Sequence, residues 1–89
     1  MTTVERFVSY NLGSLPWVKA IFFMKKEYSY SIYTVIDEFS ESLFAPILTE
    51  EELIIDTFPE YQFDFRVREA QGRDPSEAVP VWADKLFQR

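Results

Sequence analysis

The chain has 89 residues, of which 47% are hydrophobic, 18% aromatic and 27% charged, and these values predict one globular domain with a small, ring-rich core. Its net charge of −6 disfavours binding to nucleic acid or to an anionic membrane, which require positive potential, and suits a basic partner. Cysteine and histidine are absent, which excludes disulfides, thiolate or imidazole metal sites, and Cys–His or Ser–His catalysis.

Membrane and cofactor signals are also missing from the sequence. No apolar run approaches the stretch of about 20 residues that spans a bilayer, and the N-terminus lacks a signal-peptide pattern. We therefore expect a cytoplasmic protein without membrane association. Gly13 and Gly72 belong to neither a phosphate-binding loop nor a dinucleotide fingerprint, so we expect no cofactor.

The N-terminal stretch TTVERFVSYNLG predicts a helix. Thr2, followed three residues later by Glu5, matches a capping box, and Gly13 stands where a glycine just past the last turn would end the helix. The apolar residues at helical spacing are Val4, Phe7, Val8 and Leu12.

Residues 17–26 and 30–39 predict two strands. Both stretches are rich in aromatic and β-branched residues and are apolar on both faces, which favours strands covered on both sides. The link between them is short, so we expect an antiparallel hairpin.

The main helix is predicted over residues 42–58. Pro46 is tolerable only in a first turn, and the acidic run TEEE at 49–52 offers an alternative start, because a helix N-terminus favours negative charge. Pro59 ends the helix. Its apolar stripe consists of Phe44, Ile47, Leu48, Ile54, Ile55 and Phe58.

The remaining elements are a third strand over 61–68, a short helix and a fourth strand. The string DPSEAV predicts the short helix, with Asp74 as its cap and Glu77 completing the box. The string VPVWADKLFQR predicts the last strand, with Trp82 and Leu86 on one side.

The predicted order is α-β-β-α-β-α-β in a single α+β domain covering residues 1–89. We expect two layers, namely a four-stranded mixed sheet with the two longer helices mainly on one face. The crossover between the second and third strands should make these two strands parallel.

The acidic residues Asp37, Glu38 and Asp64 are the candidates for catalysis. Carboxylates at neighbouring strand ends suit Mg²⁺, which prefers oxygen ligands. Adjacent residues of a strand point to opposite faces, however, so we favour a solvated sheet face and predict no metal site.

The basic residues Lys25, Lys26, Arg66 and Arg68 are the candidates for anion binding. Arginine and lysine at one strip of a sheet can hold a carboxylate or a phosphate. Salt bridges between neighbouring strands are the favoured interpretation, and they keep a sheet face soluble.

The first two predicted strands carry more apolar residues than one face can bury. If the helices cover one face, an apolar row remains on the other, and an uncovered row of this kind usually marks an interface. The alternative is that the N-terminal helix covers the second face. The candidate interface residues are Ile21, Phe23, Tyr33 and Val35.

The layout resembles the minimal nucleotidyltransferase domains of toxin–antitoxin systems. VKAIFFM resembles the first strand of that family, FDFRV the third, and SEAVPVW the closing helix-to-strand segment, so Asp64 matches the last metal-binding carboxylate. The string MKKEYSYSIYTV lacks the glycine and the paired aspartates that the family has there. The resemblance therefore implies a catalytically silent relative, and a ferredoxin-like sandwich also accounts for the pattern.

Two functional hypotheses follow. The first is a small non-enzymatic protein that acts through protein contacts, as a homodimer or as the acidic partner of another protein. The second is a divergent nucleotidyl or phosphoryl transferase that uses Asp64 with Asp37 or Glu38 around Mg²⁺.

Overall fold

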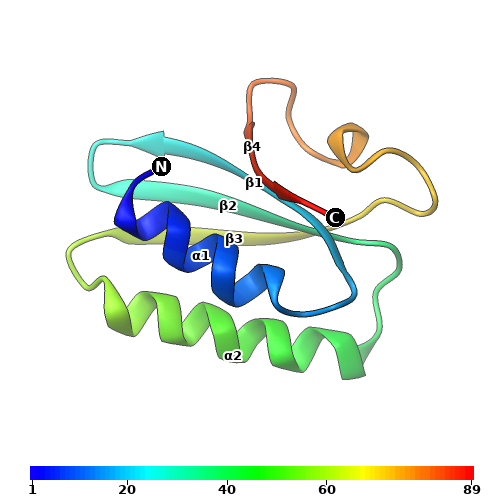
Figure 1. The fold of residues 1–89 in the computed structure, drawn as a ribbon, viewed down its shortest axis with the longest axis horizontal. Coiled ribbons are helices and arrows are strands. Elements are labelled where there is room, and N and C mark those ends of the chain that lie inside the picture. The colour runs from blue at the N-terminus through cyan, green and yellow to red at the C-terminus, as the bar shows by residue number, and fades with distance from the viewer.

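Two helices lie on one face of a four-stranded sheet in the computed structural model, which describes residues 1–89 (Figure 1). The predicted α+β class and the predicted order of elements are confirmed. The elements are α1 (Thr3–Gly13), β1 (Val18–Lys26), β2 (Ser29–Ile36), α2 (Glu41–Thr57), β3 (Gln62–Glu69), the 3₁₀ helix η1 (Pro75–Ala78) and β4 (Asp84–Gln88).

The strands are arranged in the order β3-β2-β1-β4. β1 pairs with β2 and with β4 in antiparallel fashion, and β2 pairs with β3 in parallel, so the predicted hairpin and crossover are both confirmed. β3 and β4 are therefore the two edge strands. α2 makes the connection from β2 to β3 and runs beside β3 in the opposite direction (Figure 1).

The main core lies between the helices and the sheet. α1 begins at its N-cap Thr2, whose Oγ1 accepts a hydrogen bond from the Glu5 amide at 3.2 Å, as the capping pattern predicts. Helical spacing then places one stripe of each helix against alternate residues of the strands. The fully buried side chains of this core include Val8, Leu12, Val18, Ile21, Ile32, Ile36, Ile47 and Ile54.

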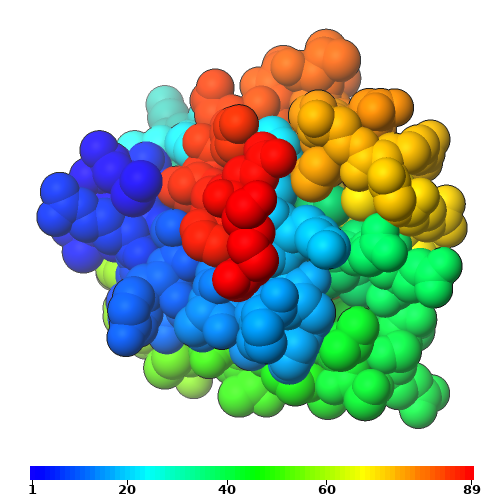
Figure 2. Space-filling view, turned by 45° about the vertical axis from the view of Figure 1, so that its right-hand side comes forward, coloured from blue at the N-terminus to red at the C-terminus, as the bar shows by residue number.

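The segment of residues 70–83, which includes η1, covers part of the second face of the sheet. Its residues Ala70, Ala78, Val79 and Ala83 pack with Phe22 and its neighbours in a second, smaller core. α1 lies on the same face as α2, so the alternative in which α1 covers the second face is not the one observed. Figure 2 shows the C-terminal residues lying between α1 and the orange and gold 70–83 segment.

The end of α1 differs from the prediction. Gly13 is the last helical residue, Ser14 is the C-cap, and the only glycine with a positive φ is Gly72. A Cβ built on Gly13 would lie 3.1 Å from Cε1 of Phe87, so glycine here permits the close approach of the β4 ring. Arg89 satisfies the helix end, because its Nη2 donates to the carbonyl oxygens of Gly13 at 2.6 Å and Leu15 at 3.0 Å.

Three other boundaries differ as well. β2 ends at Ile36, and the side chain of the next residue, Asp37, accepts a hydrogen bond from the Gly72 amide in the turn after β3. β4 begins at Asp84, and Trp82 lies before it with 67% of its surface exposed. Pro46 lies inside α2 rather than in the first turn, where it removes one backbone hydrogen bond.

Two neighbouring isoleucines test which side of α2 faces the core. Ile54→Ala should lower the free energy of unfolding by about 2–5 kcal/mol, because it leaves a cavity in the core. Ile55→Ala should change it by about 1 kcal/mol or less, because Ile55 is exposed. Urea denaturation measures both values, and equal losses would contradict this orientation of α2.

Candidate functional site

The three candidate catalytic carboxylates do not come together. Asp64 pairs with Ser31 in β2, whereas Asp37 follows Ile36 at the end of that strand. Asp37 lies six positions along the chain from Ser31, which corresponds to about 20 Å. Asp37 Oδ1 instead accepts a hydrogen bond from the Gly72 amide at 2.6 Å, and Glu38 is exposed. No group of three or more acidic side chains is placed to hold a metal ion.

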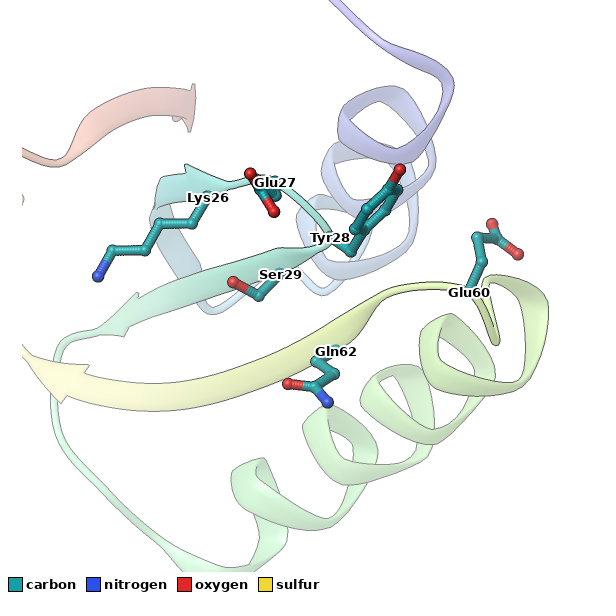
Figure 3. A pocket seen from close by; sticks show the side chains of 6 residues that line it. All are labelled: Lys26, Glu27, Tyr28, Ser29, Glu60 and Gln62. Carbon is teal, nitrogen blue, oxygen red and sulfur yellow. The ribbon is translucent and has the colours of Figure 1, made fainter.

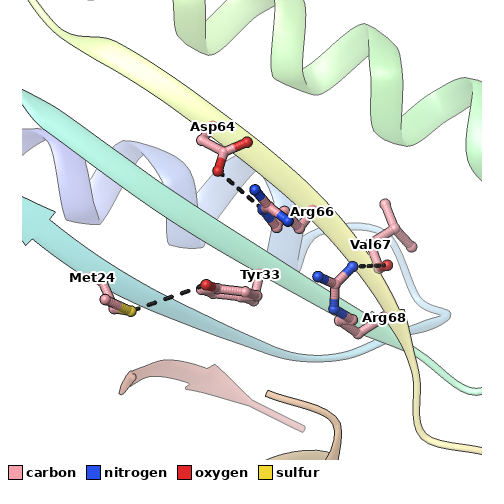
Figure 4. A network of polar contacts seen from close by, with 6 residues as sticks. All are labelled: Met24, Tyr33, Asp64, Arg66, Val67 and Arg68. Carbon is pink, nitrogen blue, oxygen red and sulfur yellow. Dashed lines mark hydrogen bonds and ion pairs between the residues drawn. The ribbon is translucent and has the colours of Figure 1, made fainter. Parts of the chain in front are cut away.

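Asp64, which the resemblance matches to the last metal-binding carboxylate of the family, takes part in an ion pair instead. Its Oδ2 lies 3.0 Å from Nε of Arg66, and both side chains are about half exposed. Figure 4 shows this pair on the side of β3 that also carries Arg68. The predicted salt-bridging thus occurs within one strand rather than between neighbouring strands.

The four basic candidates are divided between several positions. Arg68 Nη1 donates to the Val67 carbonyl at 3.2 Å, and its guanidinium lies 5.8 Å from the Tyr33 ring centroid. Lys25 lies over the Tyr30 ring on the helix-covered face, at 5.7 Å. Lys26 is at the hairpin end, where its partner Ser29 pairs with Gln62, four residues before Arg66. These cations form no common anion site.

The four candidate interface residues lie on opposite faces of the sheet, and the chain itself covers them. Ile21 is fully buried and Phe23 is half-buried in the main core. Tyr33 and Val35 are buried in the smaller core beneath the 70–83 segment. These apolar residues are therefore buried by other parts of the same chain, and the exposed apolar surface lies elsewhere.

Two polar hollows lie at opposite ends of the sheet. The larger, of about 590 Å³, lies between the β1–β2 hairpin and the start of β3, and Figure 3 shows its Lys26 and Glu60 side chains pointing apart. The smaller, of about 220 Å³, contains Arg73 and Arg89, whose guanidinium groups donate to backbone carbonyls. In neither hollow do several unpaired polar side chains point toward a common position where a ligand could bind.

A third hollow, of about 380 Å³, is an apolar groove between α2 and β3. The Phe39 and Phe44 rings form one end, with centroids 5.2 Å apart, and the Phe39 amide donates to Glu69 Oε2 at 2.8 Å. This bond ties the chain before α2 to the end of β3. We call this hollow the α2–β3 groove; its lining residues are Phe39, Phe44, Leu48, Glu51, Phe65, Val67 and Glu69.

Glu51 is the one buried carboxyl in the α2–β3 groove. It lies on the helix stripe of Ile47 and Ile54, and only 8% of its surface is exposed. The single salt bridge of the chain joins two other residues, so no cation of this chain neutralises Glu51. Burial raises the pKa of Glu51 from the usual 4.5 to about 7. A carboxyl in such surroundings favours a positively charged partner.

β3 borders the groove with a backbone edge that no other strand pairs with. The amides of Gln62 and Ala70 donate to β2-side carbonyls of Tyr28 and Ile36, both at 2.8 Å. Because the ladder alternates, the amides and carbonyls of the residues between them at odd positions point away from β2. The Arg68 bond to the Val67 carbonyl agrees with this direction, since no strand lies there.

The sequence contains one signal for this groove, which the predicted elements do not use. The apolar stripe predicted for the main helix includes Phe44, Leu48 and Ile55, and TEEE is an alternative start of that helix. Glu51, however, falls at helical spacing between Ile47 and Ile54, in the middle of the apolar stripe. A charged residue within an apolar helix stripe indicates a binding site, because a structural core would have an apolar residue there.

Comparison with protein-family models, with curated proteins and with solved structures finds no match to this chain. No helix of the structure has the length and apolar character needed to cross a membrane.

The buried carboxyl predicts a pH-dependent stability. Folded Glu51 keeps its proton up to about pH 7, whereas an unfolded glutamate releases it near 4.5, so the folded state binds more protons in this window. The free energy of unfolding should therefore fall as the pH rises through the window, by at most about 3 kcal/mol.

Glu51→Gln should remove this contribution. The variant should match the wild-type protein at about pH 5 and should exceed its stability at about pH 8 in urea denaturation. Glu52→Gln removes the same charge from an exposed neighbouring position and serves as the control. Equal effects of the two substitutions would show that Glu51 ionises normally.

Proposed function

We propose that this protein is a non-enzymatic interaction domain that binds another protein at the α2–β3 groove. The observation that carries the proposal is the placement of an apolar groove directly beside an unpaired edge strand. Such a pair of features supplies the two requirements of protein recognition, namely apolar contact area and directional hydrogen bonds.

The distribution of exposed apolar side chains supports the same surface. Phe39 and Leu48 line the groove and are 52% and 43% exposed, respectively. Phe65 and Val67 of β3 are half-buried next to them. Apolar residues scattered singly over a surface are ordinary, but a contiguous group that lines a hollow indicates a contact site.

The rings of the groove favour a protein partner. Phe39, Phe44 and Phe65 present aromatic area, and aromatic residues are enriched at the centres of protein interfaces. The volume of about 380 Å³ is at the lower end of the range for small-molecule pockets, which runs from about 300 to 1,000 Å³. An open groove of this size accommodates a few side chains of a longer segment.

Site-specific photocross-linking tests the proposal. A photoreactive amino acid in place of Leu48 should form an adduct in cells of the source organism, because Leu48 lies in the groove. The same amino acid in place of Tyr10, which is 78% exposed on α1, is the control. Adduct masses distinguish a second copy from another protein. No adduct at Leu48, or equal adducts at both positions, would contradict the proposal.

A further inference from the structure

The charges of the chain are unevenly distributed. Residues 37–60, which include α2, contain eight acidic residues and no basic residue. The rest of the chain contains seven acidic and nine basic residues, a net charge of +2, and the two parts sum to −6. Glu51 of this stretch and Glu69 of β3 line the α2–β3 groove, and no basic residue lines it, which favours a positively charged occupant and disfavours an acidic one.

Glu51 adds a specific anchor to this general attraction. The side chain is more than nine-tenths buried, lines the groove and has no counter-ion within the chain. Hydrogen bonds between a buried carboxylate and a guanidinium or ammonium group are among the strongest in proteins. A basic side chain that enters the groove would supply the partner that Glu51 lacks.

The unpaired edge of β3 determines the backbone shape of the occupant. The outward-pointing amides and carbonyls belong to the residues whose side chains lie on the groove side, including Phe65 and Val67. The Val67 carbonyl accepts a hydrogen bond from Arg68 Nη1, which an added strand would replace. A strand added at about 4.8 Å from β3 would direct every second side chain over the groove. Those side chains would meet Phe39, Leu48 and Glu51.

We infer that the α2–β3 groove binds an extended segment of a basic partner protein, which adds to β3 as a fifth strand and places a lysine or arginine on Glu51. The inference rests on the proposed function and specifies the chemistry of the partner. The apolar side chains two residues before and after the basic one occupy the ends of the groove, beside Phe44 and Phe65.

A second copy of the chain fits this groove poorly. A twofold contact would bring the acidic helix of one copy against the same helix of the other, and like charges across an interface are destabilising. No basic residue lies in 37–60 to offset the repulsion. The side chains of Arg66 and Arg68 leave β3 on its other face, although Nη1 of Arg68 reaches the Val67 carbonyl at the strand edge.

Selection from a displayed library of random nonapeptides tests the inference. Selections on the wild-type protein and on Glu52→Gln should enrich sequences with one lysine or arginine flanked at two-residue spacing by apolar residues. The selection on Glu51→Gln should not enrich the basic residue, because its anchor is lost. All selections are carried out at about pH 8, where Glu51 is ionised.

The enriched peptide then permits a quantitative comparison. Its affinity, measured by fluorescence anisotropy, should fall about tenfold or more for Glu51→Gln and about twofold or less for Glu52→Gln. Replacing the basic residue of the peptide with norleucine should cause a similar loss for the wild-type protein and little further loss for Glu51→Gln.

Backbone methylation of the same peptide tests strand addition. Two versions carry N-methyl groups on alternate residues, one on the odd set and one on the even set. One version should lose binding, because its methylated amides face β3, and the other should retain it, because its methylated amides face solvent. Loss of binding in both versions, or in neither, would overturn strand addition.

The outcomes separate this inference from the proposed function. One outcome is that the selected peptides block the cross-link at Leu48 but lack a basic residue, and another is that they bind equally well to Glu51→Gln. Either result overturns the inference and leaves the proposed protein-binding function of the groove intact. If no peptide is enriched and Leu48 forms no adduct, the proposed function fails. A dimer in light scattering that Leu48→Glu dissociates would overturn the inference in favour of a second copy.

Discussion

The parallel pairing of β2 with β3 is the constraint on which the rest of the structure depends. Parallel neighbours cannot be joined by a tight turn, so the chain must cross the sheet between them, and α2 makes this crossing. An α-helix of 17 residues is about 25 Å long, and a strand of eight residues spans about 26 Å. α2 therefore runs along the full length of β3.

The groove follows from this crossover and from the strand order. β3 is an edge strand, so no further strand lies beneath the outer side of α2. The stripe with Ile47 and Ile54 reaches the sheet, while the next stripe, with Leu48 and Ile55, extends past it. The other edge strand, β4, has only five residues, and Arg89 beyond it bonds to the end of α1.

The second face of the sheet, unlike the α2–β3 groove, is covered by another segment of the chain. Small side chains of the 70–83 segment, which includes η1, let this segment approach Phe22 and Val35 closely without a third α-helix. The turn that starts this segment has positive φ at Gln71 and Gly72, and Asp37 accepts the amide of Gly72. Similar coverage is absent over α2 and β3, where the aromatic residues remain half-buried and a carboxyl lies among them.

The sequence predicted the fold better than it predicted the site, for a physical reason. Period-two and helical apolar patterns, the Thr2 cap and the short hairpin link act locally, so they located the elements and the parallel pair correctly. Whether Val35 or Leu48 is covered depends on segments distant in sequence, which local patterns do not report. Gly13 illustrates the same limit, because its neighbour Phe87 is 74 residues away.

Glu51 connects the stability of the free chain with its proposed binding. Removing a carboxylate from water costs free energy unless a counter-ion and hydrogen bonds replace the water, and the free chain supplies neither to Glu51. An apolar residue at this position would complete the stripe of Ile47 and Ile54 and would strengthen the core. The penalty is thus specific to the free state, and a bound cation would relieve it. A residue that weakens the isolated fold and strengthens a complex is expected at a binding site rather than in a structural core.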